Sequence, residues 1–145
     1  MPTVRDVLAV KGTVLHTTHT QATVLDATRV MNQHKIGALV VMEEDRVVGM
    51  FTERDVLQRV VAQELMPATV RVGDVMTREI VCCLPDDDLD EVSAIMRQKR
   101  VRHLPVCDSE GTLHGMVSMG DVNAQYASNA EQQIHFLNEY IYGRA

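Results

Sequence analysis

Two copies of one short motif place a hydroxyl and a carboxylate at the start of a helix. Each copy has a glycine, two apolar residues, a hydroxyl residue, two variable positions and an aspartate, at residues 49–55 and 115–121. An apolar run precedes each copy and a helix-compatible run follows it, which indicates a strand leading into a helix. The N–H groups and dipole of a helix N-terminus favour an anion such as phosphate. The hydroxyl can donate to phosphate and the carboxylate can accept from ribose hydroxyls, which assigns these roles to Thr52, Asp55, Ser118 and Asp121.

The same pattern has a purely structural interpretation. Thr or Ser followed three residues later by aspartate, before an apolar run, is also a capping box, with Thr52 or Ser118 as the cap. For a single copy the cap is favoured, because helix starts are far commoner than ligand sites. Two copies in matched surroundings weaken that interpretation, since a cap does not require the preceding glycine. The sequence leaves both interpretations open.

The similarity between the two halves extends beyond the motif. Residues 4–8 match 72–76, and residues 35–41 match 100–106. An i, i+3, i+4, i+7 pattern, typical of an amphipathic helix, occurs in each half, at Val24, Ala27, Thr28 and Met31 and at Leu89, Val92, Ser93 and Met96. The chain is therefore two copies of one unit. Each unit should run short strand, helix, strand, strand, helix.

Periodicity and turn residues predict the individual elements. Strands are expected at 14–17, 39–42, 46–51, 80–83, 104–107 and 113–117. Helices are expected at 24–34, capped by Thr23, at 52–62, at 89–99, capped by an aspartate of 86–88, and from 118 onward. A last helix at 129–142 lies outside the repeat and carries an apolar face made of Ile134, Phe136, Leu137, Tyr140 and Ile141. That face must pack on the module or on a second chain, since a short helix gains little from propensity alone.

These matches make the chain similar to a tandem pair of CBS domains, the cystathionine-β-synthase-type repeats. Such a pair is called a Bateman module, and the chain resembles the stand-alone bacterial type. The resemblance covers nearly everything from Thr3 to Asn123. It implies an α/β (α+β) fold of two βαββα repeats, packed with pseudo-two-fold symmetry, plus a C-terminal helix. The expected boundaries are 3–62 and 72–128 for the repeats, 63–71 for the linker and 129–145 for the C-terminal helix. The resemblance also implies a regulatory, non-catalytic role, with an adenosyl ligand (AMP, ADP, ATP or NAD) in the clefts between the repeats.

The resemblance implies that Arg54 clamps the phosphate. A solvated side chain is the alternative, but Arg pairs bidentately with phosphate and the family often has Arg here. The second copy has Gly120 at the matching position and Ser118 in place of threonine. We therefore expect two unequal sites, of which the first prefers the more highly charged phosphate chain.

The remaining predicted positions would surround the adenosyl group. Small residues at Gly37 and Ala38 would let the ring approach the backbone closely, between apolar walls. His103 can contact the ligand or can be a satisfied core histidine. The positions assigned to the adenosyl group are Thr17, Thr18, Ile36, Gly37, Ala38, Cys82, Val101, Arg102 and His103.

Composition argues against several other classes. The formal charge of −6 and the lack of a basic run argue against nucleic acid as a main partner. The sequence has neither an apolar run of membrane-span length nor a signal-peptide pattern, and its three cysteines form no disulfide framework, so a cytoplasmic location is expected. His16 and His19 have an odd offset and no third ligand, so no metal is required. No nucleophile, base and orienting group assemble, so we expect no enzyme.

The expected partners are an adenine nucleotide, a second copy of the chain and an unidentified regulated protein. Helices that flank a small sheet leave apolar surface that one pair of repeats cannot cover. The C-terminal helix adds a further apolar patch. We therefore expect a homodimer with closed two-fold symmetry, in which this helix lies in the interface or braces it.

Overall fold

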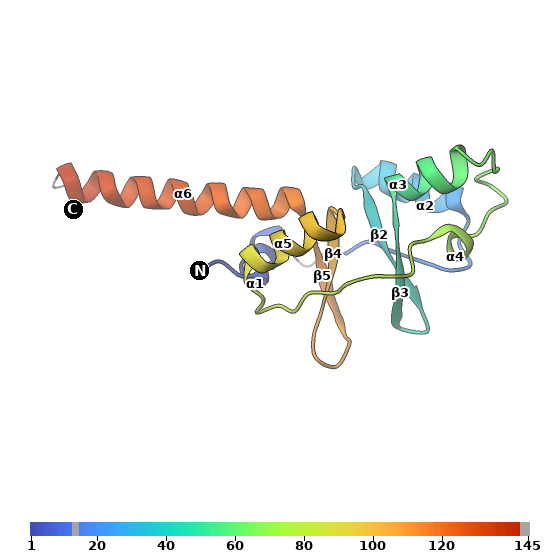
Figure 1. The fold of residues 1–145 in the computed structure, drawn as a ribbon, viewed down its shortest axis with the longest axis horizontal. Coiled ribbons are helices and arrows are strands. Elements are labelled where there is room, and N and C mark those ends of the chain that lie inside the picture. Colours follow the sequence, from blue (N-terminus) through green and yellow to red (C-terminus); the bar gives the residue numbers. More distant parts are fainter. Residues whose placement is uncertain (13–14, 143–145) are drawn as a thin grey trace.

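A computed structural model describes residues 1–12 and 15–142 (Figure 1). The first unit contains a three-stranded sheet in the order β1 (Thr17–His19), β2 (Ala38–Glu43), β3 (Arg46–Thr52). Strand β1 pairs parallel with β2, and β2 pairs antiparallel with β3. The first strand thus ends later than the sequence predicted, and Val14, its expected start, lies outside the described residues.

The second unit repeats this plan with a smaller sheet. Strands β4 (His103–Cys107) and β5 (Leu113–Ser118) pair antiparallel. Both hairpins carry an irregularity at the same place, between Val41 and Met42 and between Val106 and Cys107. This shared irregularity supports the equivalence of the two units, and the predicted mixed helix-and-strand fold class is confirmed.

The strand expected at 80–83 is wrong, because within the described residues this segment makes only an isolated parallel bridge, from Cys83 to Val106. The bridge uses bonds from Cys83 N to Pro105 O and from Cys107 N to Cys83 O, both 2.9 Å. Extending this ladder toward Val81 would require a backbone N–H at Pro105. Proline has none, so the pairing cannot continue.

Each unit has a helix on its sheet, and both start where the sequence predicted. Helix α2 (Val24–His34) is capped by Thr23, whose hydroxyl accepts from Asp26 N, and α5 (Leu89–Lys99) is capped by Asp88. The helix expected at 52–62 consists of a short turn, α3 (Glu53–Asp55), followed by a π-helical segment, η1 (Val56–Val61). The wider π-helical turn is visible in the bond from Ala62 N to Leu57 O, at 2.9 Å.

The lead-in helices are exchanged between the units. Helix α1 (Val4–Lys11) begins the chain, yet its Val4 and Val7 pack in the core of the second unit, with Leu89, Val92 and Leu104. Helix α4 (Val72–Val75) begins the second repeat in the sequence, yet it packs its valines in the core of the first unit, with Leu39 and Phe51. A third apolar cluster, Ala38, Val40, Met50 and Met116, joins the two sheets. The two units are therefore built into each other.

A single helix, α6 (Met119–Tyr142), follows β5 and includes the segment expected as a separate last helix. Figure 1 shows it running away from the two units toward the C-terminus. Its outer apolar side chains are solvent-exposed, with Phe136 at 67% and Tyr140 at 80%. In the part of the chain that the structure describes, no helix is both long and apolar enough to cross a membrane.

Candidate functional site

Both copies of the motif form complete capping boxes. In the first, Thr52 N donates to Asp55 Oδ2 at 3.0 Å and Asp55 N donates to Thr52 Oγ1 at 3.3 Å. In the second, Ser118 N donates to Asp121 Oδ2 at 2.9 Å and Asp121 N donates to Ser118 Oγ at 3.0 Å. The capping interpretation therefore holds for both copies as far as local structure goes. Capping leaves open whether the same side chains also bind a ligand.

The two aspartates have different surroundings. Asp55 is buried, with 4% exposure, and its second oxygen accepts from Thr77 Oγ1 at 3.0 Å with Arg59 nearby. Asp121 is about a quarter exposed and pairs with Lys11, whose Nζ lies 2.7 Å from Oδ2. Burial raises the pKa of Asp121, but the bonds from Lys11 and Ser118 outweigh this effect and lower it below its ordinary value.

The glycine at the start of each motif has a packing explanation. A Cβ at Gly49 would lie 2.7 Å from Thr77 O, and a Cβ at Gly115 would lie 2.9 Å from Leu8 Cδ2. Thr77 and Leu8 belong to the exchanged lead-in segments. The repeated glycine therefore makes room for the other repeat's lead-in. The preceding glycine, which a helix cap alone does not require, is therefore no longer an argument against the interpretation of the motifs as helix caps only.

Strand pairing brings several predicted residues together at one end of each sheet. Ala38 pairs with Thr52 in the first unit, and His103 pairs with Ser118 in the second. Gly37 adjoins the same strand end, and its carbonyl accepts from Glu53 N at 3.0 Å. The Glu53 carboxylate lies against Gly37, only 2.8 Å from where a Cβ would be. An exposed acidic side chain thus covers the backbone that was expected to face adenine.

These two strand ends meet across the pair of repeats. Arg54 Nη1 donates to the carbonyl oxygen of Arg100 in the other unit, at 2.9 Å. His103 is half-buried, and burial and nearby Lys11 lower its pKa, while Glu53 from the first unit opposes this shift. Acidic and basic side chains from both repeats thus surround one histidine.

Sequence reasoning missed two side chains of this region, Lys11 and Glu53, and the backbone carbonyl of Arg100. Glu53 lies inside the motif, where an acidic residue in the first helical turn has an ordinary structural explanation. Lys11 also donates to Met116 O at 2.8 Å, and its partners are more than a hundred residues away in sequence. Only the exchange of α1 brings Lys11 here, so no local signal could have identified it.

The other predicted residues lie farther along the sheets or at the helix ends. Thr17 and Thr18 pair with Val40 and Val41 in the interior of β2, and Thr18 is buried. Cys82 is exposed and directly precedes Cys83, which forms the isolated bridge to β4. Cys82 contacts Cys107, which lies at the opposite end of β4 from His103. Ile36 and Val101 follow the left-handed residues that end α2 and α5, and both pack against the cores. Arg102 is exposed and its carbonyl accepts from Met119 N at 2.9 Å.

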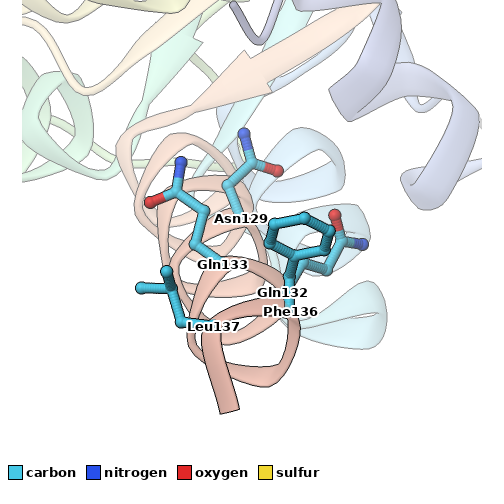
Figure 2. Close-up of a pocket in the computed structure, with 5 residues that line it drawn as sticks. All are labelled: Asn129, Gln132, Gln133, Phe136 and Leu137. Atoms are coloured by element: carbon cyan, nitrogen blue, oxygen red, sulfur yellow. The ribbon is translucent and has the colours of Figure 1, made fainter. Parts of the chain in front are cut away.

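Two surface hollows lie outside the predicted site. One, of about 490 Å³, is lined entirely by α6, through Asn129, Gln132, Gln133, Phe136 and Leu137 (Figure 2). The other, of about 320 Å³, is polar and lies around α4, β1 and β2, with Arg71 and Arg78 in its wall. Neither is lined by a predicted nucleotide-binding residue. At the predicted site, the exposed side chains of Glu53, Arg54 and Lys11 contact Gly37, the Arg100 carbonyl and the Met116 carbonyl, respectively.

The fold and the paired capping boxes define a two-repeat module. A family model described as "CBS domain" matches residues 4–62 and 72–127, so the chain belongs to the CBS-domain family and contains two CBS repeats. It is 36% identical over 129 residues to the CBS domain-containing protein CBSX3, mitochondrial, of Arabidopsis thaliana, covering 86% of this chain. The chain spans only 62% of the length of that relative.

Two solved structures are also similar. A protein with CBS domains from Burkholderia ambifaria is 35% identical, with a TM-score of 0.84 over 88% of this chain and 95% of that one. The CBS domain pair of protein MJ0100, solved in complex with 5-methylthioadenosine and S-adenosyl-L-methionine, has a TM-score of 0.78 over 89% of this chain and 98% of that one. At 22% identity, this second likeness shows the fold alone.

Proposed function

We propose that this chain is a regulatory module that binds an adenine nucleotide (AMP, ADP, ATP or NAD) in the clefts between its repeats. The observation that carries this proposal is the meeting of the two strand ends, where Arg54 of one repeat bonds to Arg100 of the other. Basic side chains of Lys11, Arg54 and Arg102 there suit phosphate, and the boxed hydroxyls and carboxylates suit ribose. MJ0100, which shares the fold, binds two adenosyl compounds, and this is consistent with the adenosyl part of the proposed ligand.

The side chains that fill this region are able to move. Glu53, Arg54 and Lys11 are all exposed, so their displacement by a ligand costs little packing. Arg54 can turn from the Arg100 carbonyl to a phosphate, which is a stronger, charge-assisted partner. Glu53 must swing away from Gly37 before an adenine ring can approach that backbone.

The two sites should remain unequal. The first box has Arg54 beside it, whereas the second has Gly120 and draws its cation, Lys11, from the exchanged helix. Lys11 is a point charge that already neutralises Asp121, so it has less capacity for a second anion. We therefore propose that the first site takes the more highly charged phosphate chain.

Calorimetric titration and thermal shift with AMP, ADP, ATP and NAD test the nucleotide proposal. Binding to the folded state alone raises the melting temperature in a concentration-dependent way. No shift and no heat with any of the four would refute it. Identical, independent sites for all of them would refute the inequality alone.

The competing proposal is a structural or interaction protein whose motifs are only helix caps. The complete capping boxes, the internally satisfied carboxylate of Asp55 and the packing reason for both glycines favour it. Under this proposal adenine nucleotides leave the melting temperature unchanged. The same titration therefore separates the two.

We further propose a homodimer joined through α6. Residues spaced alternately by three and four form a heptad seam along this helix, at Ala127, Ala130, Ile134, Leu137 and Ile141, and all are exposed. Such a seam is self-complementary between two copies and buries apolar side chains that one copy leaves in water. The hollow beside Phe136 and Leu137 lies along the same helix (Figure 2). A cytoplasmic location, a non-catalytic role and an unidentified regulated protein complete the proposal.

A further inference from the structure

The sulfur atoms of Cys82 and Cys107 are in contact, with the Cys107 thiol pointing to Cys82 Sγ at 3.4 Å. Cys82 is exposed and Cys107 is buried at the end of β4. A disulfide needs the two sulfurs at about 2.05 Å, so closure requires an approach of a little over an ångström. The backbone bonds of Cys83 to Pro105 and Cys107 hold this segment beside the end of β4, and the exposed Cys82 side chain can turn toward Cys107 to close the remaining distance.

From this contact we infer that Cys82 and Cys107 form a peroxide-sensitive thiol pair that closes to an intramolecular disulfide. The inference rests on the thiol geometry and is independent of the proposed nucleotide function. Cys82 is the thiol that a peroxide in solution reaches first, because it is the exposed member. Cys107 is the resolving thiol, because it is already in contact with the sulfur that becomes oxidised.

The disulfide forms in two steps, and each step conserves atoms and electrons. The Cys82 thiolate attacks the peroxide O–O bond, gains one oxygen to become a sulfenic acid, and the other oxygen leaves as hydroxide, which takes up a proton to form water. The Cys107 sulfur then attacks the Cys82 sulfur, the S–O bond breaks, and the sulfenic oxygen leaves as water with the Cys107 proton. Two thiols are oxidised by two electrons, and one hydrogen peroxide is reduced to water.

The direction of its thiol, and not its acidity, explains why the third cysteine does not take part. Cys83 is 1% exposed, and its thiol points to the carbonyl of Pro105 at 3.6 Å. Burial raises the pKa of Cys83 to about 12, with Asp87 adding to the effect. Burial also raises the pKa of Cys107 to about 12, with further contributions from its bond to Cys82 and from the Cys82 charge. Oxidation of Cys82 to a neutral sulfenic acid removes that charge, which eases loss of the Cys107 proton when it is needed.

The test treats the full-length chain with hydrogen peroxide, unfolds it in N-ethylmaleimide and counts labelled thiols by mass. The reduced chain carries three labels, because it has three free cysteines. The treated chain should carry one label at monomer mass and regain three after dithiothreitol. Three labels after treatment, a disulfide found only between chains, or irreversible oxygen addition without a disulfide would each overturn the inference.

Variants identify the pair, because tryptic peptide 79–97 contains both Cys82 and Cys83 and cannot distinguish them. Cys83→Ser is the matched control and should lose both of its remaining thiols. Cys82→Ser changes an exposed side chain, so it should fold, and it should keep both thiols under the same treatment. Cys107→Ser should let dimedone trap the sulfenic acid on Cys82. A disulfide that persists in Cys82→Ser, or disappears in Cys83→Ser, would show that Cys83 is the true partner and overturn the assignment.

Discussion

A Cβ atom at Gly49 would lie 2.7 Å from the carbonyl oxygen of Thr77, which belongs to the lead-in of the other repeat. The same carbonyl accepts from Met50 N at 3.0 Å, so the close approach is fixed by backbone pairing. At the matching position, a Cβ on Gly115 would meet the end of the Leu8 side chain. A leucine methyl can rotate away, whereas a paired backbone cannot.

This difference predicts unequal costs for two equivalent substitutions. Gly49→Ala should lower the free energy of unfolding by about 1–3 kcal/mol, the usual cost of overpacking, because it displaces Thr77 from Met50. Gly115→Ala should cost about 1 kcal/mol or less. Urea denaturation of both variants measures the difference. Equal losses of stability would show that the Thr77 backbone moves away as easily as the Leu8 side chain, and would contradict this prediction.

A second prediction concerns the two boxed aspartates. Asp55→Ala leaves Thr52 N and the Thr77 hydroxyl without their buried acceptor, so it should cost about 2–3 kcal/mol of stability. Asp121→Ala removes a more exposed cap and should cost about 1 kcal/mol. If the carboxylates also bind ribose, each variant should lose about 1.5–3 kcal/mol of nucleotide affinity in addition. Calorimetry below the variants' melting temperatures separates the two roles, and unchanged affinity would leave only the capping role.

Arg54 provides a more selective probe of the nucleotide site, because its side chain is exposed and its one hydrogen bond within the described residues is to the Arg100 carbonyl. Arg54→Ala should change stability by no more than about 0.5 kcal/mol. It should weaken ATP binding by about tenfold, equivalent to about 1.4 kcal/mol, and weaken AMP binding less. Arg46→Ala, an exposed arginine at the far end of β3 from Thr52, is the control and should leave affinity unchanged. Equal losses in the two variants would point to a general charge effect.

His103, which lies between the two repeats, should make the stability of the folded chain depend on pH. Its folded-state pKa lies below the unfolded value of about 6.5, so the folded chain binds fewer protons there. Its contribution to stability is complete above about pH 6.5 and is lost as the pH falls through the lower folded value. His103→Gln should therefore reduce the drop in melting temperature between about pH 7.5 and about pH 5.5. An equal drop in the two proteins would contradict this contribution of His103.

The assembly prediction requires two proteins of different length. The full chain should be a dimer by light scattering, and a chain ending at Ser128 should be a monomer or a weaker dimer, because it lacks Ile134, Leu137 and Ile141. Leu137→Glu in the full chain tests the seam without shortening the helix, and should weaken the dimer by about 1–3 kcal/mol. A monomeric full chain at micromolar concentration would contradict the dimer. An equally stable dimer after truncation would move the interface away from α6.

Much of the fold could be predicted because its signals are local. The cap Thr23, a cap among the aspartates 86–88, the two hairpins and the repeat order all follow from spacing within a few residues. The absence of a strand at 80–83 could not be predicted from Pro105 alone. The effect of Pro105 depends on which segment pairs with β4, and the sequence does not show this. The exchange of α1 and α4 between the two units could not be predicted from the sequence. The sequence shows that Val4 and Val72 are apolar and need a core, but it does not show which core each one enters. Contacts such as Lys11 with Asp121 depend on that exchange.

The exchanged helices also bear on how the chain folds and unfolds. The first core lacks Val72 and Val75 until the second half of the chain arrives, and the second core lacks Val4 and Val7 without the first. Neither half holds a complete interior, so heat and denaturant should melt the two repeats in one cooperative transition rather than in succession. Cleaving the chain within 63–71 would then yield two pieces that gain structure only by complementing each other. The two repeats would then behave as one folding domain.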